Sequence, residues 1–219
     1  MTASDDILPV ALQSDQKSAA VIFDAFGTLL QIREGRHPYR RLIKVGIEQG
    51  RRPRPDDARR IMTNPWDLCD TAEAFGIEVP EKMIQELTAD LEAEVAGIVS
   101  YPDAVDAVAA LQEAGMAITV CSNLALPYAA AIKRHFPTLE AVFSFAAGAI
   151  KPELEIYKAC CQLLAVQPSE ASMVGDSLQC DCDGPRALGI HGYHLDRTGG
   201  LGHFSNLMQF AQHLLQGRQ

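Results

Sequence analysis

The sequence predicts an α/β fold in which a doubly wound parallel sheet carries a small, all-helical cap after its first strand. Two observations lead to this prediction. From residue 99 onward, short apolar segments alternate with helical patterns, which is typical of a parallel sheet with helices on both faces. Residues 32–98, in contrast, contain helical patterns broken by prolines and glycines and no strong strand. We therefore expect a Rossmann-like core over residues 19–31 and 99–219, a helical cap over 32–98 and a flexible tail over 1–18.

The composition is that of a globular protein that can bury a substantial core. Hydrophobic residues make up 47% of the 219 residues, and charged residues make up 21%. The formal net charge of -9 argues against a nucleic-acid binder, because neutralising phosphates requires a basic face. No stretch approaches the roughly 18 apolar residues of a membrane span, and the first residues lack the pattern of a signal peptide. We expect a cytoplasmic protein with six free thiols, a small anionic substrate and no nucleic-acid or membrane partner.

The first strand is expected over residues 19–23, an apolar run rich in strand formers that ends at Asp24. A sharp turn at Gly27-Thr28 follows it. The clearest helix of the cap is expected over residues 81–99, where apolar side chains recur near the helical period.

Strands and helices are then expected to alternate to the end of the chain. The expected strands cover residues 116–121, 141–145, 171–175 and 192–195. The expected helices cover residues 102–114, 127–135, 152–164, 181–188 and 203–216.

Three polar clusters directly follow predicted strands: Asp24, Ser122-Asn123 and Asp176-Ser177. Ligands bind outside the carboxyl ends of the strands in open parallel sheets, so these side chains are expected to converge. Two carboxylates that close raise each other's pKa, and a hard cation such as Mg²⁺ would relieve their repulsion. A carboxylate beside that cation and Lys151 stays ionised and can act as a nucleophile. Ser122 and nearby amides could hold the oxygens of an anionic substrate.

The basic residues are concentrated at the start of the cap. Residues 33–60 contain ten of the nineteen Lys and Arg residues and carry a net charge of +6, whereas the rest of the chain carries −15. The cluster nearest the first strand is Arg33, Arg36, His37, Arg40 and Arg41. Such a cluster either forms a solvated helix face or attracts an anionic substrate. Arg40 and Arg41 are the candidates for substrate binding.

Four segments resemble, in order, the motifs of the haloacid dehalogenase (HAD) superfamily, in the branch that has a helical cap after the first motif. The segments are Phe23-Asp24-Ala25-Phe26-Gly27-Thr28-Leu29, Ser122-Asn123, Lys151-Pro152-Glu153 with Ile156-Tyr157, and Val174-Gly175-Asp176-Ser177 with Asp181 and Gly184–Gly189. The resemblance covers residues 19 to about 195, and the fourth motif is the most specific.

The resemblance implies a role for each matching residue. Asp24 would be the nucleophile, Lys151 would stabilise it and the covalent intermediate, and Ser122 would bind the transferred group. Mg²⁺ would be held by Asp24, Asp176 and the main-chain carbonyl of Phe26, and Asp181 would support it, directly or through water. The other residues expected to contact substrate are Asn123, Thr28, Arg40 and Arg41.

One position departs from the pattern of the phosphatases in this superfamily. These enzymes usually carry a second Asp two residues after the nucleophile, where it protonates the leaving group and later activates water. This chain has Phe26 there. Losing a general acid–base typically costs on the order of 10²–10⁴-fold in rate.

Three functions are compatible with this departure. The first is Mg²⁺-dependent hydrolysis of a small phosphorylated metabolite with a good leaving group or an acid from the cap. The second is a metal-free 2-haloacid dehalogenase, because halide leaves without a proton and those enzymes carry a similar first motif. The third is a weakly active or inactive protein that binds a ligand or another protein. Asp176, Ser177 and Asp181 favour the first.

Overall fold

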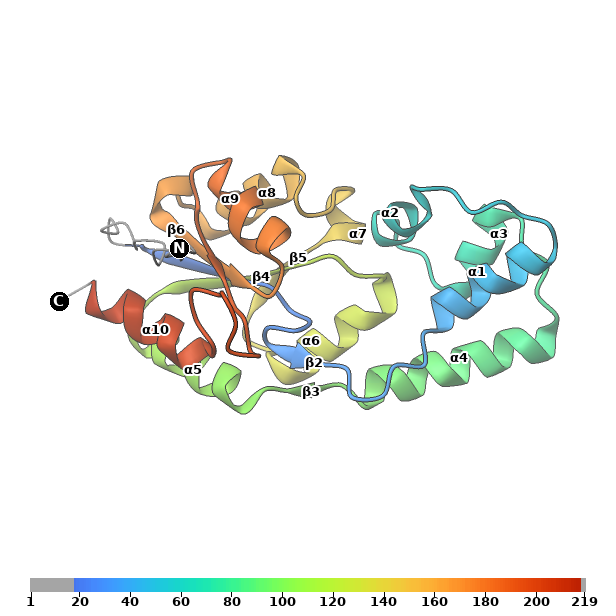
Figure 1. The fold of residues 1–219 in the computed structure, drawn as a ribbon, viewed down its shortest axis with the longest axis horizontal. Coiled ribbons are helices and arrows are strands. Elements are labelled where there is room, and N and C mark those ends of the chain that lie inside the picture. The colour runs from blue at the N-terminus through green and yellow to red at the C-terminus, as the bar shows by residue number, and fades with distance from the viewer. Residues whose placement is uncertain (1–17, 218–219) are drawn as a thin grey trace, which may run out of the picture.

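The structure, a computed structural model, describes residues 18–217 of the chain. The predicted tail over residues 1–18 therefore lies, apart from Ser18, outside the described residues. One parallel sheet runs through the molecule in the order β5-β4-β1-β6-β7, with the cap helices beyond one end of it (Figure 1). Its strands are β1 (Ala20–Phe23), β4 (Ala117–Ser122), β5 (Glu140–Phe143), β6 (Ala171–Gly175) and β7 (His191–His194). This doubly wound topology confirms the predicted fold class.

β1 is the central strand of the sheet, and every one of its side chains is apolar and buried. It pairs with β4 on one side and with β6 on the other. Alternate residues of a strand point to opposite faces of a sheet. Val21 and Phe23 accordingly contribute to one hydrophobic cluster, whereas Ile22 contributes to the other.

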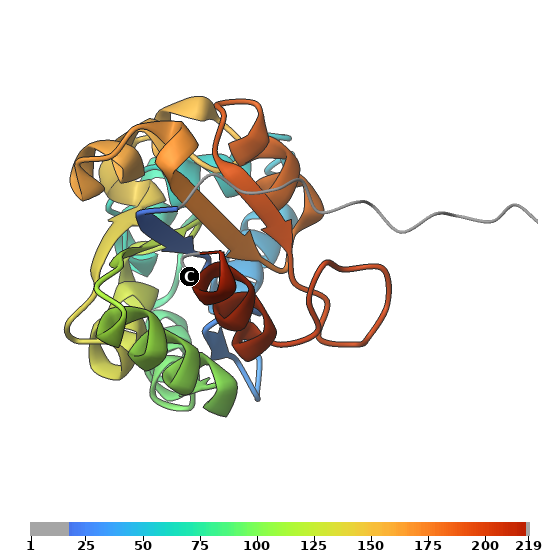
Figure 2. The same ribbon diagram turned by 90° about the vertical axis from the view of Figure 1, so that its left-hand side faces the viewer.

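Helices cover both faces of the sheet, as Figure 2 shows in a view along it. The face of Phe23 is covered by α5 (Pro102–Glu113), α6 (Ala129–His135) and α10 (Leu207–Gln216). The face of Ile22 is covered mainly by α8 (Leu154–Leu164). None of the helices within residues 18–217 has the length and apolar character needed to cross a membrane.

Several of the predicted elements have different bounds in the structure; the helix predicted over 81–99, for example, ends at Ala96, and Val99 lies in a short strand. The helix predicted over 203–216 begins only at Leu207, because Phe204 bridges to Leu195 and Asn206 caps the helix. The strand predicted over 141–145 ends at Phe143, and a short helix α7 (Ser144–Ala147) follows it. The helix predicted over 181–188 is divided into a π-helical turn η3 (Leu178–Asp183) and a short α9 (Gly184–Arg186).

The cap consists of four helices between two short strands that the sequence pattern does not reveal. The antiparallel pair β2 (Leu30–Gln31) and β3 (Val99–Ser100) joins it to the core. The helices are α1 (Pro38–Glu48), α2 (Asp57–Met62), α3 (Leu68–Phe75) and α4 (Glu81–Ala96). They pack around their own hydrophobic cluster, which includes Leu42, Phe75 and Leu87. Trp66 lies edge-on against Phe75 in the same cluster.

A buried carboxylate attaches the α4 side of the cap to the core. Glu94 of α4 is only 3% exposed. It accepts hydrogen bonds from the main-chain N–H groups of Arg36 and His37, at the start of α1, and from the hydroxyl of Tyr128. Tyr128 belongs to the core turn η1 (Leu126–Tyr128) that follows β4. Because a buried carboxylate without partners is costly, these contacts hold α1, α4 and η1 together.

An ion pair attaches the other side of the cap to the core. Arg59 of α2 donates to both carboxylate oxygens of Glu153, at 2.7 and 3.0 Å. Glu153 lies two residues after Lys151, at the start of α8. Both side chains are largely in contact with solvent, with exposed fractions of 45% and 33%. An exposed pair of this kind contributes no more than about 1 kcal/mol.

Replacing Asp57 by asparagine is expected to destabilise the cap in a pH-dependent way. Asp57 accepts from Arg51, at 2.8 Å from Nη1, and from the main-chain N–H of Arg54, at 2.9 Å. The hydrogen bond from Arg51 lowers the pKa of Asp57 below its ordinary value of 3.8. We expect a loss of about 2 kcal/mol in the free energy of unfolding at pH 7.

The sign of the pH dependence follows from the lowered pKa. The stabilisation by ionised Asp57 is complete above pH 3.8 and is lost as the pH falls through its lower, folded-state pKa. The free energies of unfolding of the wild type and the variant, measured in urea, should therefore become equal as the pH is lowered. A stability difference that grows below pH 4 would contradict the assigned pair.

Candidate active site

The three polar clusters predicted from the strand ends do converge. Asp24 follows β1, Ser122 ends β4, and Asp176 follows β6, all at the carboxyl edge of the sheet. The sheet order changes direction between β1 and β6, which is where open α/β sheets bind their ligands. Carboxylate oxygens of Asp24, Asp176 and Asp181 lie within 4.8 Å of one another. The structure thus assembles a compact acidic group at the expected position.

Lys151 enters this group from the loop that precedes α8. Its Nζ lies 2.6 Å from Oδ1 of Asp24 and 2.7 Å from Oδ1 of Asp181. The lysine is only 4% exposed. Burial alone would lower the pKa of Lys151, but the two carboxylates raise it well above its ordinary value. Lys151 is therefore held as a cation between two acids.

Asp24 keeps one carboxylate oxygen free of protein contacts. Its Oδ2 is buried and has no hydrogen-bond partner among the described residues. Burial raises the pKa of Asp24 to about 6, with Asp181 adding to the rise and Lys151 opposing it. Burial and the neighbouring Asp181 also raise the pKa of Asp176. A further positive charge beside Oδ2 would relieve both effects, so the three acids fit a divalent cation with oxygen ligands.

Asp181 differs from the other two acids because both of its oxygens have partners. Oδ1 accepts from Lys151, and Oδ2 accepts from the main-chain N–H of Ser177 at 3.0 Å. Asp24 Oδ2 and the Asp176 carboxylate are the freer oxygens. Asp181 is thus placed to orient Lys151 and the loop after β6.

Two glycines make the close approach of the acids possible. A Cβ atom on Gly27 would overlap the Asp176 carboxylate, and a Cβ on Gly175 would overlap that of Asp181. Gly27 also has a φ of 89°, which side chains disfavour. Both positions therefore require glycine for steric reasons.

The side-chain amide of Asn123, which the sequence suggests as a substrate contact, hydrogen-bonds the main chain of Lys151. Its Nδ2 donates to the carbonyl oxygen of Lys151 at 2.9 Å, and its Oδ1 accepts from the Lys151 N–H at 2.7 Å. The amide thus clamps the main chain of Lys151 from the loop after β4. Ser122, its neighbour, is 1% exposed at the end of the strand.

Replacing Asn123 by alanine is expected to displace Lys151. The variant leaves the N–H and carbonyl of Lys151 without these partners, which should cost about 1–3 kcal/mol in the free energy of unfolding. Turnover should fall by about 10²-fold, because a misplacement near 1 Å has that effect. Asn64→Ala is a matched control, since Asn64 donates one side-chain hydrogen bond to the carbonyl of Arg60 within the cap. Equal losses of activity in the two variants would contradict a positioning role for Asn123.

The loop after β1 is held by an arginine that the sequence analysis does not single out. Arg197 donates to the carbonyls of Gly27 and Thr28, at 3.2 and 2.6 Å, and pairs with Asp103 at 3.0 Å. Arg197 follows β7 at the same edge of the sheet. Its position as a polar residue after a predicted strand was the sequence feature that could have identified it. Thr28 itself is buried, and its hydroxyl has no partner among the described residues.

Phe26 occupies the site's border with the cap. Its ring lies edge-on to Tyr128, with the centroids 6.0 Å apart. Burial and the hydrogen bond to Glu94 raise the pKa of Tyr128 above its ordinary value of 10.0. Phe26 supplies no proton-transfer group, and its ring fills space between the loop after β1 and η1.

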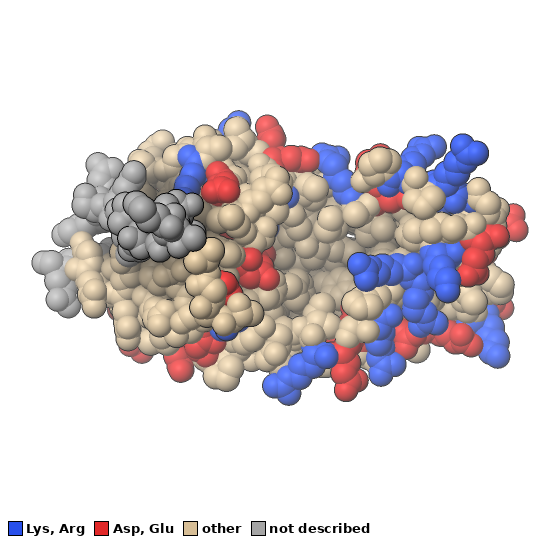
Figure 3. All heavy atoms as spheres, viewed as in Figure 1, with Lys and Arg blue, Asp and Glu red and all other residues tan. Residues whose placement is uncertain are grey.

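The two arginines predicted to contact substrate lie on different sides of α1. Arg40 lines a cavity of about 510 Å³ between the cap and the core residues Ala125 and Tyr128. Arg41 instead pairs with Asp90 of α4, which also binds Arg36, and does not line this cavity. Figure 3 shows basic side chains over the cap half of the molecule and a hollow between cap and core.

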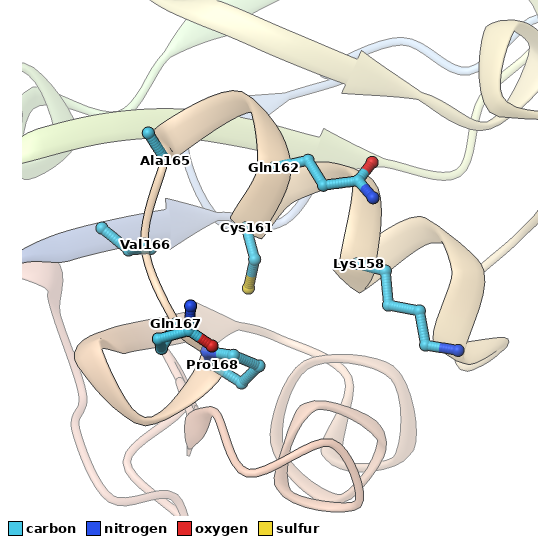
Figure 4. Close-up of a pocket in the computed structure, with 7 residues that line it drawn as sticks. All are labelled: Lys158, Cys161, Gln162, Ala165, Val166, Gln167 and Pro168. Atoms are coloured by element: carbon cyan, nitrogen blue, oxygen red, sulfur yellow. The ribbon is translucent and has the colours of Figure 1, made fainter.

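A second cavity, of about 380 Å³, lies between α8 and the turn that follows it (Figure 4). Figure 4 shows the Cys161 side chain directed into it. Burial raises the pKa of this thiol, which keeps it protonated and unreactive. None of the predicted site residues lines this cavity.

Comparison with known families identifies one match. A family model described as a haloacid dehalogenase-like hydrolase matches residues 19–189. "Haloacid dehalogenase-like hydrolase domain-containing protein 3" is similar over 62 residues, at 37% identity for the Homo sapiens protein and 36% for that of Mus musculus. That segment is 28% of this chain and spans 24% of each relative's length.

Solved structures share the fold over most of the chain. A HAD phosphatase from Thermococcus onnurineus has a TM-score of 0.59 at 22% identity, covering 89% of this chain and 97% of its own. A magnesium complex of a HAD family enzyme from Bacteroides thetaiotaomicron has a TM-score of 0.56 at 20% identity, covering 82% and 93%. An L-2-haloacid dehalogenase has a TM-score of 0.56 at 19% identity, covering 90% and 99%. At these identities the likeness shows the fold alone.

Proposed function

Because the chain belongs to the haloacid dehalogenase-like hydrolase family, we propose that it is a Mg²⁺-dependent phosphatase that acts on a small phosphorylated metabolite. The free Oδ2 of Asp24 beside Asp176 is the observation that carries this proposal, because it gives both a nucleophile and a place for a cation. Asp24, Asp176 and the carbonyl of Phe26 would hold the ion, and Asp181 would support it. When bound, Mg²⁺ would neutralise charge on the phosphoryl group.

The chain's own residues would carry out two displacements. In the first, an Asp24 oxygen attacks phosphorus, the bond to the leaving oxygen breaks, and a phosphoaspartyl group forms. In the second, water attacks this phosphorus, the bond between phosphorus and the Asp24 oxygen breaks, the Asp24 carboxylate re-forms, and inorganic phosphate leaves with the proton of the water. Lys151 would hold Asp24 in place through Oδ1, and Ser122 would bind the phosphoryl oxygens. The cap would exclude bulk water while these steps occur.

A substrate screen with and without Mg²⁺ tests this function. The panel contains phosphoesters, acyl phosphates, phosphonates and 2-haloacids, each assayed with Mg²⁺ and with EDTA. We expect phosphate release that requires Mg²⁺. Halide release from 2-chloropropionate that survives EDTA would instead indicate a dehalogenase, which Phe26 would permit because halide leaves without a proton. Turnover of no substrate, together with ligand binding, would indicate a binding protein.

A further inference from the structure

The cavity between cap and core has the size of a small-molecule site, and its core wall is in contact with the loop after β1 that carries Asp24. Its volume of about 510 Å³ is within the range of ligand pockets. Its core wall is formed by Ala125 and Tyr128, on the segment that begins with Ser122. The Tyr128 ring is also in contact with the Phe26 ring, two residues after Asp24. A substrate whose phosphoryl group reaches Asp24 would therefore place its organic part here.

The wall of this cavity offers little to the hydroxyl groups of a sugar. Most of its side chains are apolar, among them Ile43, Ile61 and Met62. The hydroxyl groups of its two tyrosines and the carboxylate of Asp57 already have protein partners. Tyr39 donates to the carbonyl of Trp66, Tyr128 donates to Glu94, and Asp57 accepts from Arg51 and Arg54. Sugar hydroxyl groups buried against the apolar part of this wall would lose their water without gaining hydrogen-bond partners there, which is unfavourable.

Two arginine side chains at the cavity have no acidic partner within residues 18–217. They are Arg40 of α1 and Arg54 of the loop before α2, and both line the cavity. Four other cap arginines do pair with acids: Arg36, Arg41, Arg51 and Arg59. The Arg51 pair also neutralises Asp57, the acidic residue of the cavity wall. The cavity therefore combines an apolar surface with an uncompensated positive charge.

We propose that the cavity binds the organic part of the substrate, and that this part is an aromatic or branched apolar group bearing a second anion. Arg40 and Arg54 bind that anion, a carboxylate or a phosphate, while the first phosphoryl group lies at Asp24. This substrate class rests on the proposed phosphatase function. We expect phosphorylated sugars to be poorer substrates than compounds of this class.

Turnover of paired aryl phosphates tests the substrate class. 4-Carboxyphenyl phosphate carries the second anion, and 4-carbamoylphenyl phosphate has the same shape without the charge. We expect the wild type to prefer the carboxylate in kcat/KM, and Arg40→Gln and Arg54→Gln each to reduce that preference by about tenfold. Arg52→Gln is the matched control, because Arg52 is exposed on the same loop and does not line the cavity. 1,4-Phenylene bisphosphate shows whether a phosphate serves better than a carboxylate.

Two results would overturn the proposal. One is a carboxylate preference that is unchanged in Arg40→Gln and Arg54→Gln, or equally reduced in Arg52→Gln. The other is a higher kcat/KM for glucose 6-phosphate than for every aryl phosphate.

Calorimetric binding of 4-carboxybenzylphosphonate and its carbamoyl analogue separates this proposal from the proposed function. If no phosphate is released but the two arginine variants lose the carboxylate preference in binding, the phosphatase function fails and the cavity assignment stands. If phosphate is released without any preference, the cavity assignment fails alone. Binding of neither phosphonate would overturn the cavity assignment.

Discussion

Replacing Asp24 by asparagine is expected to abolish turnover, with a loss on the order of 10⁴-fold or more. An amide cannot form the covalent bond to phosphorus, and removing a nucleophile from a covalent mechanism has effects of this size. The measurement is phosphate release in the presence of Mg²⁺ from the best substrate of the screen.

The same variant should remain folded and should become more stable in the absence of Mg²⁺. The pKa of Asp24 is raised from 3.8 to about 6, mainly by burial. An ionised carboxyl with a raised pKa lowers stability as the pH rises from about 4 to 6, and asparagine removes this cost. We therefore expect a higher Tm than that of the wild type at pH 7. Asp183→Asn, at an exposed position near the site, is the control for general charge removal. Full activity in Asp24→Asn would overturn the nucleophile assignment.

Replacing Phe26 by aspartate is expected to raise phosphatase activity by about 10²–10⁴-fold on alkyl phosphates. The new carboxyl would protonate the leaving alkoxide and then activate water, as a general acid–base does. The gain should be small for 4-nitrophenyl phosphate, because its leaving group needs no proton. The two substrates assayed side by side therefore separate proton transfer from other effects.

Phe26→Asn is the matched control for this gain of function. Both changes remove the contact of the Phe26 ring with Tyr128, but only aspartate can carry a proton. Equal rates in the two variants would mean that the missing acid does not limit turnover. The limit would then lie in the cap or in the fit of the substrate.

The core and the convergence of Asp24, Ser122 and Asp176 could be predicted because they depend on the order of strands. Buried strands show as apolar runs, and parallel strands bring their carboxyl ends to one edge. Lys151 was expected beside Asp24 both as a further positive charge for the carboxylates and by the family resemblance. In the structure, the side-chain amide of Asn123 holds the main chain of Lys151, 28 residues further along the chain, through hydrogen bonds of 2.7 and 2.9 Å.

Side-chain partners chosen by loops and by the rotation of helices could not be predicted. Asn123 was expected at the substrate, but its amide is used by the main chain of Lys151. Arg40 and Arg41 are adjacent in sequence, yet successive helix residues are about 100° apart, so one lines the cavity and the other reaches Asp90. A helix with arginines on several faces does not reveal which face meets the core.

The partner of Glu94 was hidden for a related reason. A glutamate among the polar residues of the helix predicted over 81–99 gives no sign that it will be 3% exposed. Its burial depends on Tyr128, 34 residues away, and on the turn at the start of α1. Such contacts arise only once the cap is packed on the core.

The two attachments of the cap to the core differ in how readily they can separate. The buried contacts of Glu94 form the hinge, and the Arg59–Glu153 pair forms the contact that can open. At the hinge, the carboxylate of Glu94 is buried, and Arg134 of the core donates to the carbonyl of Val95 at 2.8 Å. Separating the cap from the core at this side would leave buried polar groups without hydrogen-bond partners, which is costly. On the other side, Arg59 and Glu153 are both partly exposed, so water can replace the hydrogen bonds between them when they separate. We therefore expect the cap to open on the side of α2, which would release Glu153, two positions from Lys151.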